Sequence, residues 1–408
     1  MTEFYECTVI DVTDNFDKKR IPLSAKQRGD IAKIFPYYGA QSIIDYVDDY
    51  LFDGEYILVA EDGENLNSQN SNVCNLVNGK FWVNNHAHII RAKEGYNTKY
   101  LYYYLNLINF KPFVTGSAQP KLTKDNLNSI PLTIHCENYQ NKIAKMLDDL
   151  DKKIALNNKI NAELEAMAKL IYDYWFVQFD FPDANGKPYK SSGGKMIYNE
   201  ALKREIPDGW GDFKLSTILK SNYSSIGKDD CFDEIQYLDT GSLTKNIIEG
   251  TERIKPAQDK IPSRARRIIK KNDILYSTVR PNLCHYGIVK NPLDNMIGST
   301  GFVQLSSKIS SISNDLVYIF LTSSWVTERL HQIAALAVSA YPSISPNDIL
   351  DLNIALPESL GGMGSINSKF DTIYSKISLN QKENQKLSEL RDWLLPMLMN
   401  GQVTVNDS

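Results

Sequence analysis

The chain has 408 residues, too many for one ordinary domain, so its length predicts two or three domains. Its 45 Lys and Arg against 49 Asp and Glu give a net charge of −4, which disfavours a protein that binds nucleic acid indiscriminately over its whole surface. Hydrophobic residues make up 42%, without a long apolar run or a signal-like N-terminus, so we expect no membrane span and a cytoplasmic protein. The five cysteines form no CxxC pair, which disfavours a zinc cluster or a disulfide framework.

Residues 1–136 are predicted to form a mixed globular domain. Short β-rich runs bounded by Gly, Asn and Asp, such as residues 56–60 and 81–90, are typical of strands separated by turns. His86 and His88 alternate along one of these runs, which puts both imidazoles on one face, but no third metal ligand accompanies them. We therefore predict no metal site and interpret both histidines as packing or hydrogen-bonding groups.

A long helix is predicted over residues 137–180. From Ile143 onward its apolar residues recur at alternating steps of four and three, the seam of a coiled coil. The same pattern recurs 223 residues later, from Ile366, and in both copies two asparagines interrupt it. These four residues, which we expect to fix the helix register, are Asn157, Asn161, Asn380 and Asn384. A repeat over half the chain indicates two similar halves.

The second half begins after a Pro-, Gly- and Ser-rich segment, residues 181–210, which is typical of a linker. A second mixed domain is predicted over residues 211–358, and a second long helix with a tail over residues 359–408. Residues 251–271 carry eight Lys and Arg against two Asp and Glu, a basic patch in a chain that is acidic overall. Such a patch suits a partner that meets one face of the protein.

The two helices are expected to pack on each other along their seams. An antiparallel pairing would place Asn157 opposite Asn384 and Asn161 opposite Asn380, and would leave one poor match, Leu150 opposite Arg391. A parallel pairing would also match the asparagines, so the pattern alone leaves the direction open. Two unrelated amphipathic helices, each lying on its own domain, are the other interpretation.

The sequence contains no convincing catalytic constellation. It has no P-loop and no dinucleotide-binding fingerprint, since the glycines around Gly362 have neither the spacing nor a preceding strand. It also lacks the Asn-Pro-Pro-aromatic motif of amino-methyltransferases, and Pro182-Asp183 and Pro207-Asp208 supply only the first half of a nuclease motif. Lone serines such as Ser277 have neither a nucleophile elbow nor an identifiable histidine partner. We predict a protein without catalytic residues.

Four segments resemble the specificity subunit of type I restriction–modification enzymes. They are FVTGSAQPKL at 113–122, PSRARR at 262–267, DILYSTVRPN at 273–282 and LLPMLMNG at 394–401. The resemblance covers nearly the whole chain and implies an antiparallel arrangement of the helices. The expected fold class is α+β, with two globular target-recognition domains separated by two long helices in an antiparallel coiled coil and a pseudo-two-fold internal repeat.

The family implies a reader of double-stranded DNA in which each domain recognises one half of a bipartite, asymmetric site. Its helices set the gap and dock two methyltransferase (M) subunits, through which motor-nuclease (R) subunits join. Catalysis then belongs to the partners, which use S-adenosylmethionine, ATP and Mg, and no cofactor is expected in this chain. The alternatives are a targeting subunit of another restriction class, or a coiled-coil scaffold that binds proteins.

Candidate DNA contacts are the basic side chains of each domain. In the second domain they are Arg264, Arg266, Arg267, Lys270 and Lys271, with Arg280 and Tyr341 as secondary candidates. In the first domain they are Lys18, Lys19, Arg20, Lys26, Arg28 and Lys121. Such residues hold phosphates, and an arginine also reads guanine through two hydrogen bonds. For any one of them the alternative is a solvated surface charge.

Overall fold

The computed structural model describes residues 4–68, 72–116, 120–227, 229–336 and 342–405. These residues divide into two compact units: unit 1 is residues 1–155 with 384–408, and unit 2 is residues 156–383. Both units mix strands and helices, so the predicted α+β fold class is confirmed. In the described part of the chain, no helix combines the length and the apolar character that a membrane span requires.

Unit 1 is built on two four-stranded sheets. One sheet has the order β2-β9-β6-β7, and its central strand β6 is buried throughout because its sequence, YILVA, is almost wholly apolar. The other sheet has the order β4-β3-β8-β5, with β3 and β8 parallel. The strands of both sheets are β2 (Thr13–Asn15), β3 (Phe35–Tyr38), β4 (Ile43–Val47), β5 (Phe52–Asp53), β6 (Tyr56–Ala60), β7 (Cys74–Val77), β8 (Lys80–Val83) and β9 (Ala87–Ala92).

Two-stranded ribbons and short helices complete unit 1. The ribbons pair β1 (Phe4–Thr8) with β12 (Pro131–His135), and β10 (Val114–Thr115) with β11 (Lys121–Leu122). The helices are α1 (Val9–Val12), α2 (Ala25–Gly29), α3 (Thr98–Leu107) and α4 (Lys124–Asn128), with 3-10 turns η1 (Asp17–Lys19), η2 (Glu64–Leu66) and η3 (Lys111–Phe113). Asn97 caps α3, since its side chain accepts from the Tyr100 N–H.

Unit 2 repeats this topology. Its sheets have the orders β16-β25-β22-β23 and β20-β17-β24-β21, and β17 and β24 are parallel, as β3 and β8 are in unit 1. The strands are β16 (Leu219–Ser221), β17 (Ile235–Leu238), β20 (Glu252–Ile254), β21 (Ala265–Ile268), β22 (Asp273–Ser277), β23 (Tyr286–Val289), β24 (Met296–Ser299) and β25 (Phe302–Ser307). The repeat inferred from the sequence therefore extends to strand order and direction.

The remaining elements of unit 2 follow the same order, with additions. β15 (Trp210–Lys214) pairs with β26 (Asn353–Pro357) as β1 pairs with β12, so both halves have this first strand although their sequences share no motif there. The helices are α6 (Leu215–Ile218), α7 (Asn314–Leu321), α8 (Ser324–Leu336) and α9 (Pro346–Leu350), with turns η5 (Thr240–Ser242), η6 (Pro281–Leu283) and η7 (Leu360–Met363). The additions are α8 and the hairpin of β18 (Leu243–Thr244) and β19 (Ile247–Ile248).

The Pro- and Gly-rich segment before β15 is folded. It contains a hairpin of β13 (Met196–Asn199) and β14 (Arg204–Pro207), which follows the π-helical turn η4 (Asp173–Val177). Phe181 stacks on Trp210 with ring centroids 5.0 Å apart, and Tyr189 stacks on the same Phe181 at 4.8 Å. Aromatic packing thus ties this segment to the core of unit 2.

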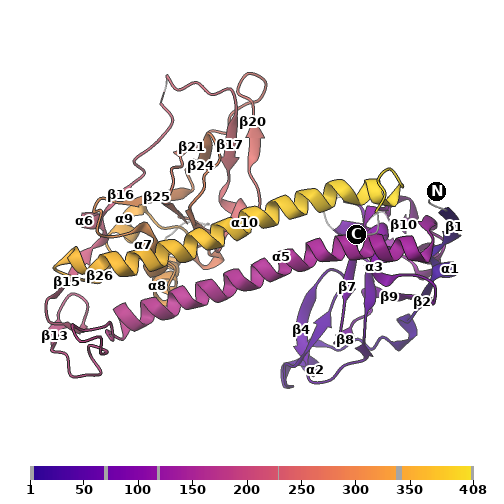
Figure 1. Ribbon diagram of the computed structural model, residues 1–408, viewed down its shortest axis with the longest axis horizontal. Helices are drawn as coiled ribbons and strands as arrows, with labels where there is room; N and C mark the ends of the chain where they lie inside the picture. The colour runs from indigo at the N-terminus through magenta and orange to yellow at the C-terminus, as the bar shows by residue number, and fades with distance from the viewer. Residues whose placement is uncertain (1–3, 69–71, 117–119, 228, 337–341, 406–408) are drawn as a thin grey trace. The chain divides into compact units, whose positions relative to one another are not determined.

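Two long helices, α5 (Glu137–Tyr172) and α10 (Gly364–Met399), each contribute residues to both units. Figure 1 draws each of them as one uninterrupted helix. In unit 1 the C-terminal residues Leu398 and Met399 of α10 join the same buried cluster as Ile143 and Leu147 of α5. Each unit therefore buries the first turns of one long helix against the last turns of the other.

The core of unit 2 has the complementary composition. There Ile366 and Phe370, near the start of α10, lie in one buried cluster with Ala168 and Tyr172, near the end of α5. In both units the start of one helix packs against the end of the other. The antiparallel direction expected from the family resemblance is therefore confirmed within each unit.

Polar contacts interrupt the apolar seam at the expected asparagines. In unit 2 the Asn380 Nδ2 donates to the Asn161 Oδ1 at 2.8 Å, and the Asn157 Nδ2 donates to the Glu383 Oε2 at 2.8 Å. Asn161 and Asn380 are 8% and 2% exposed, so this amide pair is shielded from water. A buried amide that finds its partner in only one alignment makes the other registers less favourable.

Arg391, which interrupts the apolar pattern of the seam, forms ion pairs. In unit 1 its Nη1 donates to the Asp151 Oδ1 at 2.7 Å, and its Nη2 contacts the Asp392 Oδ1 at 2.9 Å. The side chain is 29% exposed, so the ion pair stays partly hydrated. An ion pair at the edge of the seam therefore replaces the apolar contact that the sequence pattern lacks.

Replacing Asn161 alone by Leu is expected to lower the free energy of unfolding by about 1–3 kcal/mol, because the buried amide of Asn380 loses its partner. Replacing both residues by Leu is expected to recover this loss, since no unpaired polar group then remains. Urea denaturation of the two variants and the parent chain measures both effects. An Asn161→Leu variant as stable as the parent would show that the pair does not hold the register.

Candidate nucleic-acid interface

The basic segment of the second domain forms an edge of a sheet. Residues 265–268 are β21, the last strand in the order β20-β17-β24-β21. The ladder between β21 and β24 shifts register between Ala265 and Arg267, so Arg266 occupies a bulge and is exposed. Bulges re-aim a side chain, and the side chain of Arg266 at this one is exposed.

The candidate arginines of the second domain differ in exposure and in their contacts. Arg264 and Arg266 are exposed, and in the described ranges no carboxylate lies within 4.0 Å of either. Arg267 is half-buried: its Nη1 contacts the Ser225 Oγ at 3.3 Å, and its Nε is buried with no hydrogen-bond partner among the described residues. Burial lowers the pKa of Arg267. We therefore assign Arg267 to the support of the patch and the other two to its outer surface.

An aromatic ring holds two further cations beside this edge. The Lys220 Nζ lies 4.0 Å from the centroid of the Tyr223 ring, and the Lys270 Nζ lies 5.5 Å from it. The Tyr223 hydroxyl donates to the Asp273 Oδ1 at 2.5 Å, which fixes the ring. Lys220 and Tyr223 were not predicted, because neither lies in the basic run of the sequence and their proximity depends on the fold.

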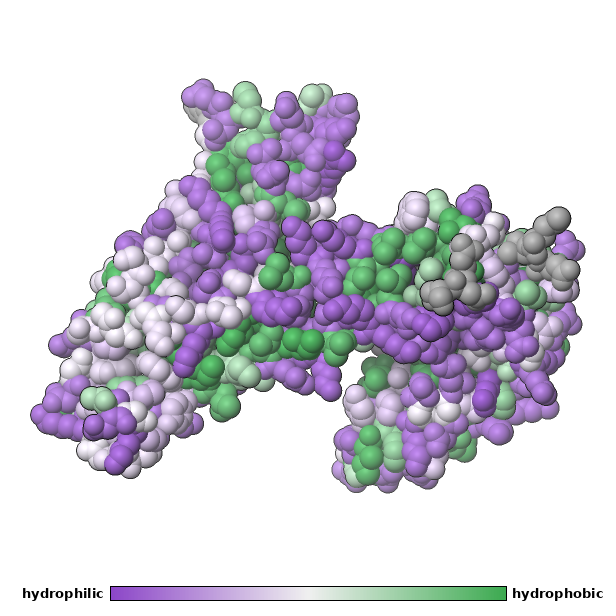
Figure 2. All heavy atoms as spheres, in the orientation of Figure 1, coloured by the Kyte–Doolittle hydropathy of each residue, from purple (hydrophilic) through white to green (hydrophobic). Residues whose placement is uncertain are grey.

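We call this surface the basic patch. Its members are Lys220, Arg264, Arg266, Arg267, Lys270 and Lys271. Backbone hydrogen bonds from Ile226 N–H to Arg266 O and from Ile268 N–H to Ser224 O join the two chain segments that carry it. Figure 2 shows that hydrophilic side chains, with apolar ones between them, cover the visible surface around β17, β20 and β21.

Arg280, one of the two secondary candidates, directly precedes the turn η6. Arg280 is exposed and has a left-handed backbone, φ +48°, and its N–H donates to the Pro342 carbonyl at 2.9 Å. Val279 and Ser343 form an isolated bridge, the counterpart of the bridge between Asp62 and Lys121 in unit 1. Tyr341 lies outside the described residues.

In the first domain a network of charges occupies the candidate surface. The Arg20 Nη1 contacts the Glu61 Oε2 at 2.6 Å and its Nη2 lies 3.6 Å from the Asp17 Oδ2. The same guanidinium donates to the Ala87 carbonyl at 2.9 Å, and the Lys121 Nζ lies 3.2 Å from the Glu61 Oε1. With its side chain only 16% exposed, Arg20 is a structural cation.

The carboxylates of this network are held in their charged form. Burial raises the pKa of Asp17, but hydrogen bonds from His88 and from the Ile89 N–H outweigh it, so the pKa lies below its usual value. Burial likewise raises the pKa of Glu61, and the hydrogen bond from Arg20 reverses the shift. Both carboxylates therefore stabilise the folded unit above their unfolded pKa values, and this stability is lost as pH falls through the lowered folded values.

Arg28 is engaged in the same way. Its Nε donates to the Asp45 Oδ2 at 2.9 Å, a second nitrogen donates to the Leu23 carbonyl, and its guanidinium lies 4.9 Å from the Tyr37 ring centroid. Hydrogen bonds from Lys33, the Tyr46 N–H and Arg28 lower the pKa of Asp45 to about 2. The other candidate cations of this domain are exposed, namely Lys18, Lys19, Lys26 and Lys121.

The two histidines do not share a metal-binding face. His88 is buried on β9, with its Nδ1 2.6 Å from the Asp17 Oδ2 and its Nε2 2.8 Å from the Leu122 carbonyl. His86 precedes the strand, and its Nδ1 lies 2.7 Å from the Asp62 Oδ2. No group of three or more His, Cys, Asp or Glu in the described ranges is placed to hold a metal ion.

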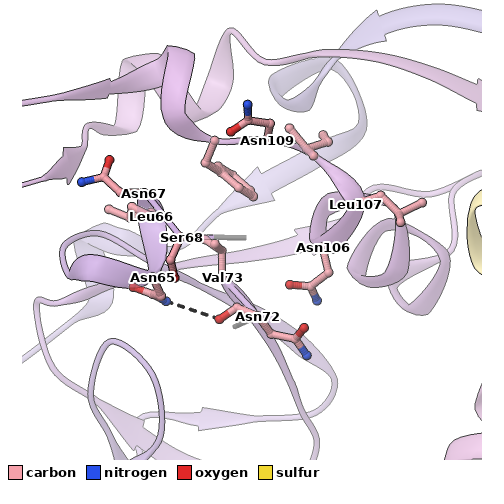
Figure 3. A pocket seen from close by; sticks show the side chains of 11 residues that line it. Asn65, Leu66, Asn67, Ser68, Asn72, Val73, Asn106, Leu107 and Asn109 are labelled. Carbon is pink, nitrogen blue, oxygen red and sulfur yellow. Dashed lines mark hydrogen bonds between the residues drawn. The ribbon is translucent and has the colours of Figure 1, made fainter. Parts of the chain in front are cut away.

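A polar cavity of about 300 Å³ lies in unit 1, between η2 and the end of α3 (Figure 3). Asparagines line much of it, and the Asn65 Nδ2 donates to the Asn72 carbonyl at 3.3 Å across one side. Asn106 is tied into the wall, where its Oδ1 accepts from the Cys74 N–H. None of the described lining residues carries a titratable side chain, so they offer no general acid or base.

Comparison with known proteins shows a similarity to one family. Residues 3–166 match the family model described as the type I restriction modification DNA specificity domain. Over its full length the chain is 24% identical to the type I restriction enzyme MjaIX specificity subunit of Methanocaldococcus jannaschii, and the match covers 98% of that protein. Over 136 residues, 33% of the chain, it is 43% identical to a protein of Haemophilus influenzae named as a type I restriction enzyme specificity subunit, and that match spans 34% of the relative.

A solved structure has the same fold. The S subunit of a type I restriction–modification system from M. genitalium aligns over 100% of this chain and 97% of its own, with a TM-score of 0.59 and 14% sequence identity. At that identity the likeness concerns the fold alone. The resemblance of the chain to type I specificity subunits is therefore confirmed.

Replacing Arg20 by Met is expected to lower the free energy of unfolding by about 3 kcal/mol, because two partly buried carboxylates lose their cation. Thermal denaturation measures the effect. Lys26→Met is the matched control, since Lys26 is exposed and its loss is expected to change the melting temperature little. Equal melting temperatures for Arg20→Met and the parent chain would contradict the structural assignment.

Proposed function

We propose that this chain is the DNA-sequence-specificity subunit of a type I restriction–modification complex and that it recognises a bipartite, asymmetric DNA site. The observation that carries the proposal is the duplicated domain: two sheets of matching order recur in both units, and each copy is followed by a long helix. DNA sites read by repeated domains consist of two half-sites. The copies differ in their candidate surfaces, so we propose that they read different half-sites.

We further propose that the long helices serve as a spacer and as a docking surface for two M subunits, through which R subunits join. In this proposal the chain performs no chemistry of its own, and S-adenosylmethionine, ATP and Mg are used by the partners. The absence of a catalytic motif from the sequence supports this division. A targeting subunit of another restriction class would have the same architecture, and co-purification with separate M and R subunits distinguishes the two.

A protein-binding coiled-coil scaffold is the alternative from another class. It accounts for the helices, but a basic patch on a domain edge, with two exposed arginines that no carboxylate of the described ranges contacts, favours an anionic partner. We propose that Arg264, Arg266 and Lys271 contact DNA directly in the second domain, with Lys220 and Lys270 on phosphates. In the first domain we propose Lys18, Lys19, Lys26 and Lys121 for the same role.

Replacing Arg264, Arg266 and Lys271 together by Met is expected to weaken DNA binding and to flatten its dependence on salt by up to about three units of slope, one for each phosphate that is no longer neutralised. Fluorescence anisotropy with a duplex carrying the recognised site, over a series of KCl concentrations, measures the slope. A matched variant with Lys187, Lys190 and Lys195 replaced, three lysines outside the patch, is expected to keep the parent slope. An unchanged slope in the first variant would remove the basic patch from the interface.

Removing residues 150–156 of α5 together with 385–391 of α10 deletes one heptad from each helix in antiparallel register. The helices shorten by about 10 Å, so the permitted gap between half-sites is expected to shrink by about three base pairs while the bases read stay the same. Selection of binding sites from a randomised duplex library measures both properties. A gap that stays the same would rule out the spacer role.

A further inference from the structure

Lys290, which directly follows β23, is a buried cation that joins the second domain to α10. Its side chain is 3% exposed. Its Nζ donates to the Asp315 Oδ2 on α7 at 2.9 Å, to the Asp371 Oδ1 on α10 at 2.9 Å and to the Asn272 Oδ1 at 3.2 Å. The three protons of the ammonium group thus each meet a different residue.

The two carboxylates around Lys290 differ in their access to water. The side chain of Asp315 is 4% exposed and that of Asp371 is 60% exposed. Burial raises the pKa of Asp315, and the charge and hydrogen bond of Lys290 oppose that shift. Asp315 also lies in the first turn of α7, where the N-terminal end of a helix favours a negative charge. Lys290 and Asp315 therefore form a buried ion pair, and Asp371 extends it to the long helix.

A buried ion pair is a poor source of stability. Removing both charges from water costs nearly as much as their attraction returns, and well-packed apolar residues of similar volume often give an equal or more stable fold. Directional bonds to two helices and to the segment before β22 nevertheless define one relative placement of these parts, which apolar contacts do not. This cluster is therefore suited to orienting the domain.

Unit 1 has an equivalent joint built from other residues. Asp148 occupies the position on α5 that Asp371 occupies on α10, and the Lys99 Nζ lies 2.8 Å from its Oδ2. Lys99 stands on α3 at the position that aligns with Asp315 on α7. The same helix aspartate thus binds a lysine of the domain in both units, although the lysine comes from different elements. Because the pairing is present in both units although the lysine comes from different elements, we infer that the contact between domain and helix is what the fold requires.

We propose that Lys290 is a positioning residue that holds the second recognition domain at one orientation on α10 and so fixes where its half-site lies relative to the spacer. The inference rests on the proposed function, because it assigns to Lys290 a part in reading a bipartite site. Lys290 acts through Asp315 and Asp371 and not by touching DNA. Its loss therefore changes the gap that the chain accepts and leaves the bases of each half-site as they are.

The test combines Lys290→Met with Asp315→Leu in the full chain, which removes the buried charges together and leaves Asp371 solvated. We expect the melting temperature to stay equal to that of the parent or to rise. In selection from a duplex library with randomised half-sites and gap length, discrimination against a gap that differs by one base pair is expected to fall about tenfold. A merely structural role would lower the melting temperature and leave the gap preference unchanged.

Two further variants sharpen the experiment. Lys290→Met with Asp315→Lys rebuilds the arrangement of unit 1, with a lysine on α7 facing Asp371, and is expected to restore the single gap. Lys214→Met with Asp351→Leu removes an exposed pair of the same chemistry, 2.8 Å apart in unit 2, and is expected to behave as the parent does.

The outcomes distinguish a failure of the proposed function from a failure of the role of Lys290. A parent chain that selects no bipartite site contradicts the proposed function. A parent that selects one gap, together with an apolar double variant that selects the same gap equally sharply, overturns the role of Lys290. Should the apolar variant fail to fold, the relocated lysine decides: a restored single gap supports the proposal, and a broadened gap overturns it.

Discussion

The antiparallel seam between α5 and α10 is the constraint on which the rest of the structure depends. Each unit buries the start of one long helix with the end of the other. In unit 1, for example, Ile143 and Leu398 lie in the same buried cluster. Neither half of the sequence completes a core by itself, because the last turns that it requires belong to the other helix. Register along the seam therefore decides which side chains meet inside both units, and the shielded amide pair of Asn161 and Asn380 has consequences beyond its own contact.

On this common framework the two domains carry different charge chemistry. In unit 1 Arg20 and Arg28 are bound by carboxylates and backbone carbonyls, so much of the local basic charge is neutralised inside the domain. In unit 2 Arg264 precedes the bulged edge strand and Arg266 lies on it; both are exposed, and in the described ranges no carboxylate lies within 4.0 Å of them. In the proposed function, different surfaces on a matching topology let the two domains read unlike half-sites.

The features predicted from the sequence are those with a local or periodic signal. The coiled-coil seam, its 223-residue repeat and the strand at residues 56–60 follow from the spacing of apolar residues, and the structure contains them. The pairing of Arg20 with Glu61 has no such signal, since the partners are 41 residues apart and meet only when the sheet forms. Composition predicted a linker at residues 181–210, but the segment contains a short hairpin. Glycine and proline mark breaks in regular structure both in linkers and around short hairpins, so composition does not distinguish the two.

Two kinds of interaction thus divide the work of specifying this fold. Apolar residues along α5 and α10 supply the burial that drives association, but because burial is not directional they permit several alignments. The buried polar groups at Asn161 and Lys290 add little net stability, since desolvation offsets most of their attraction. Their contribution is structural specificity. The amide pair favours one register along the helices, and the ammonium group, with bonds to α7 and α10, favours one orientation of the domain on α10. In the proposed function the gap between half-sites depends on both the register and the orientation, because a change in either one moves the half-site.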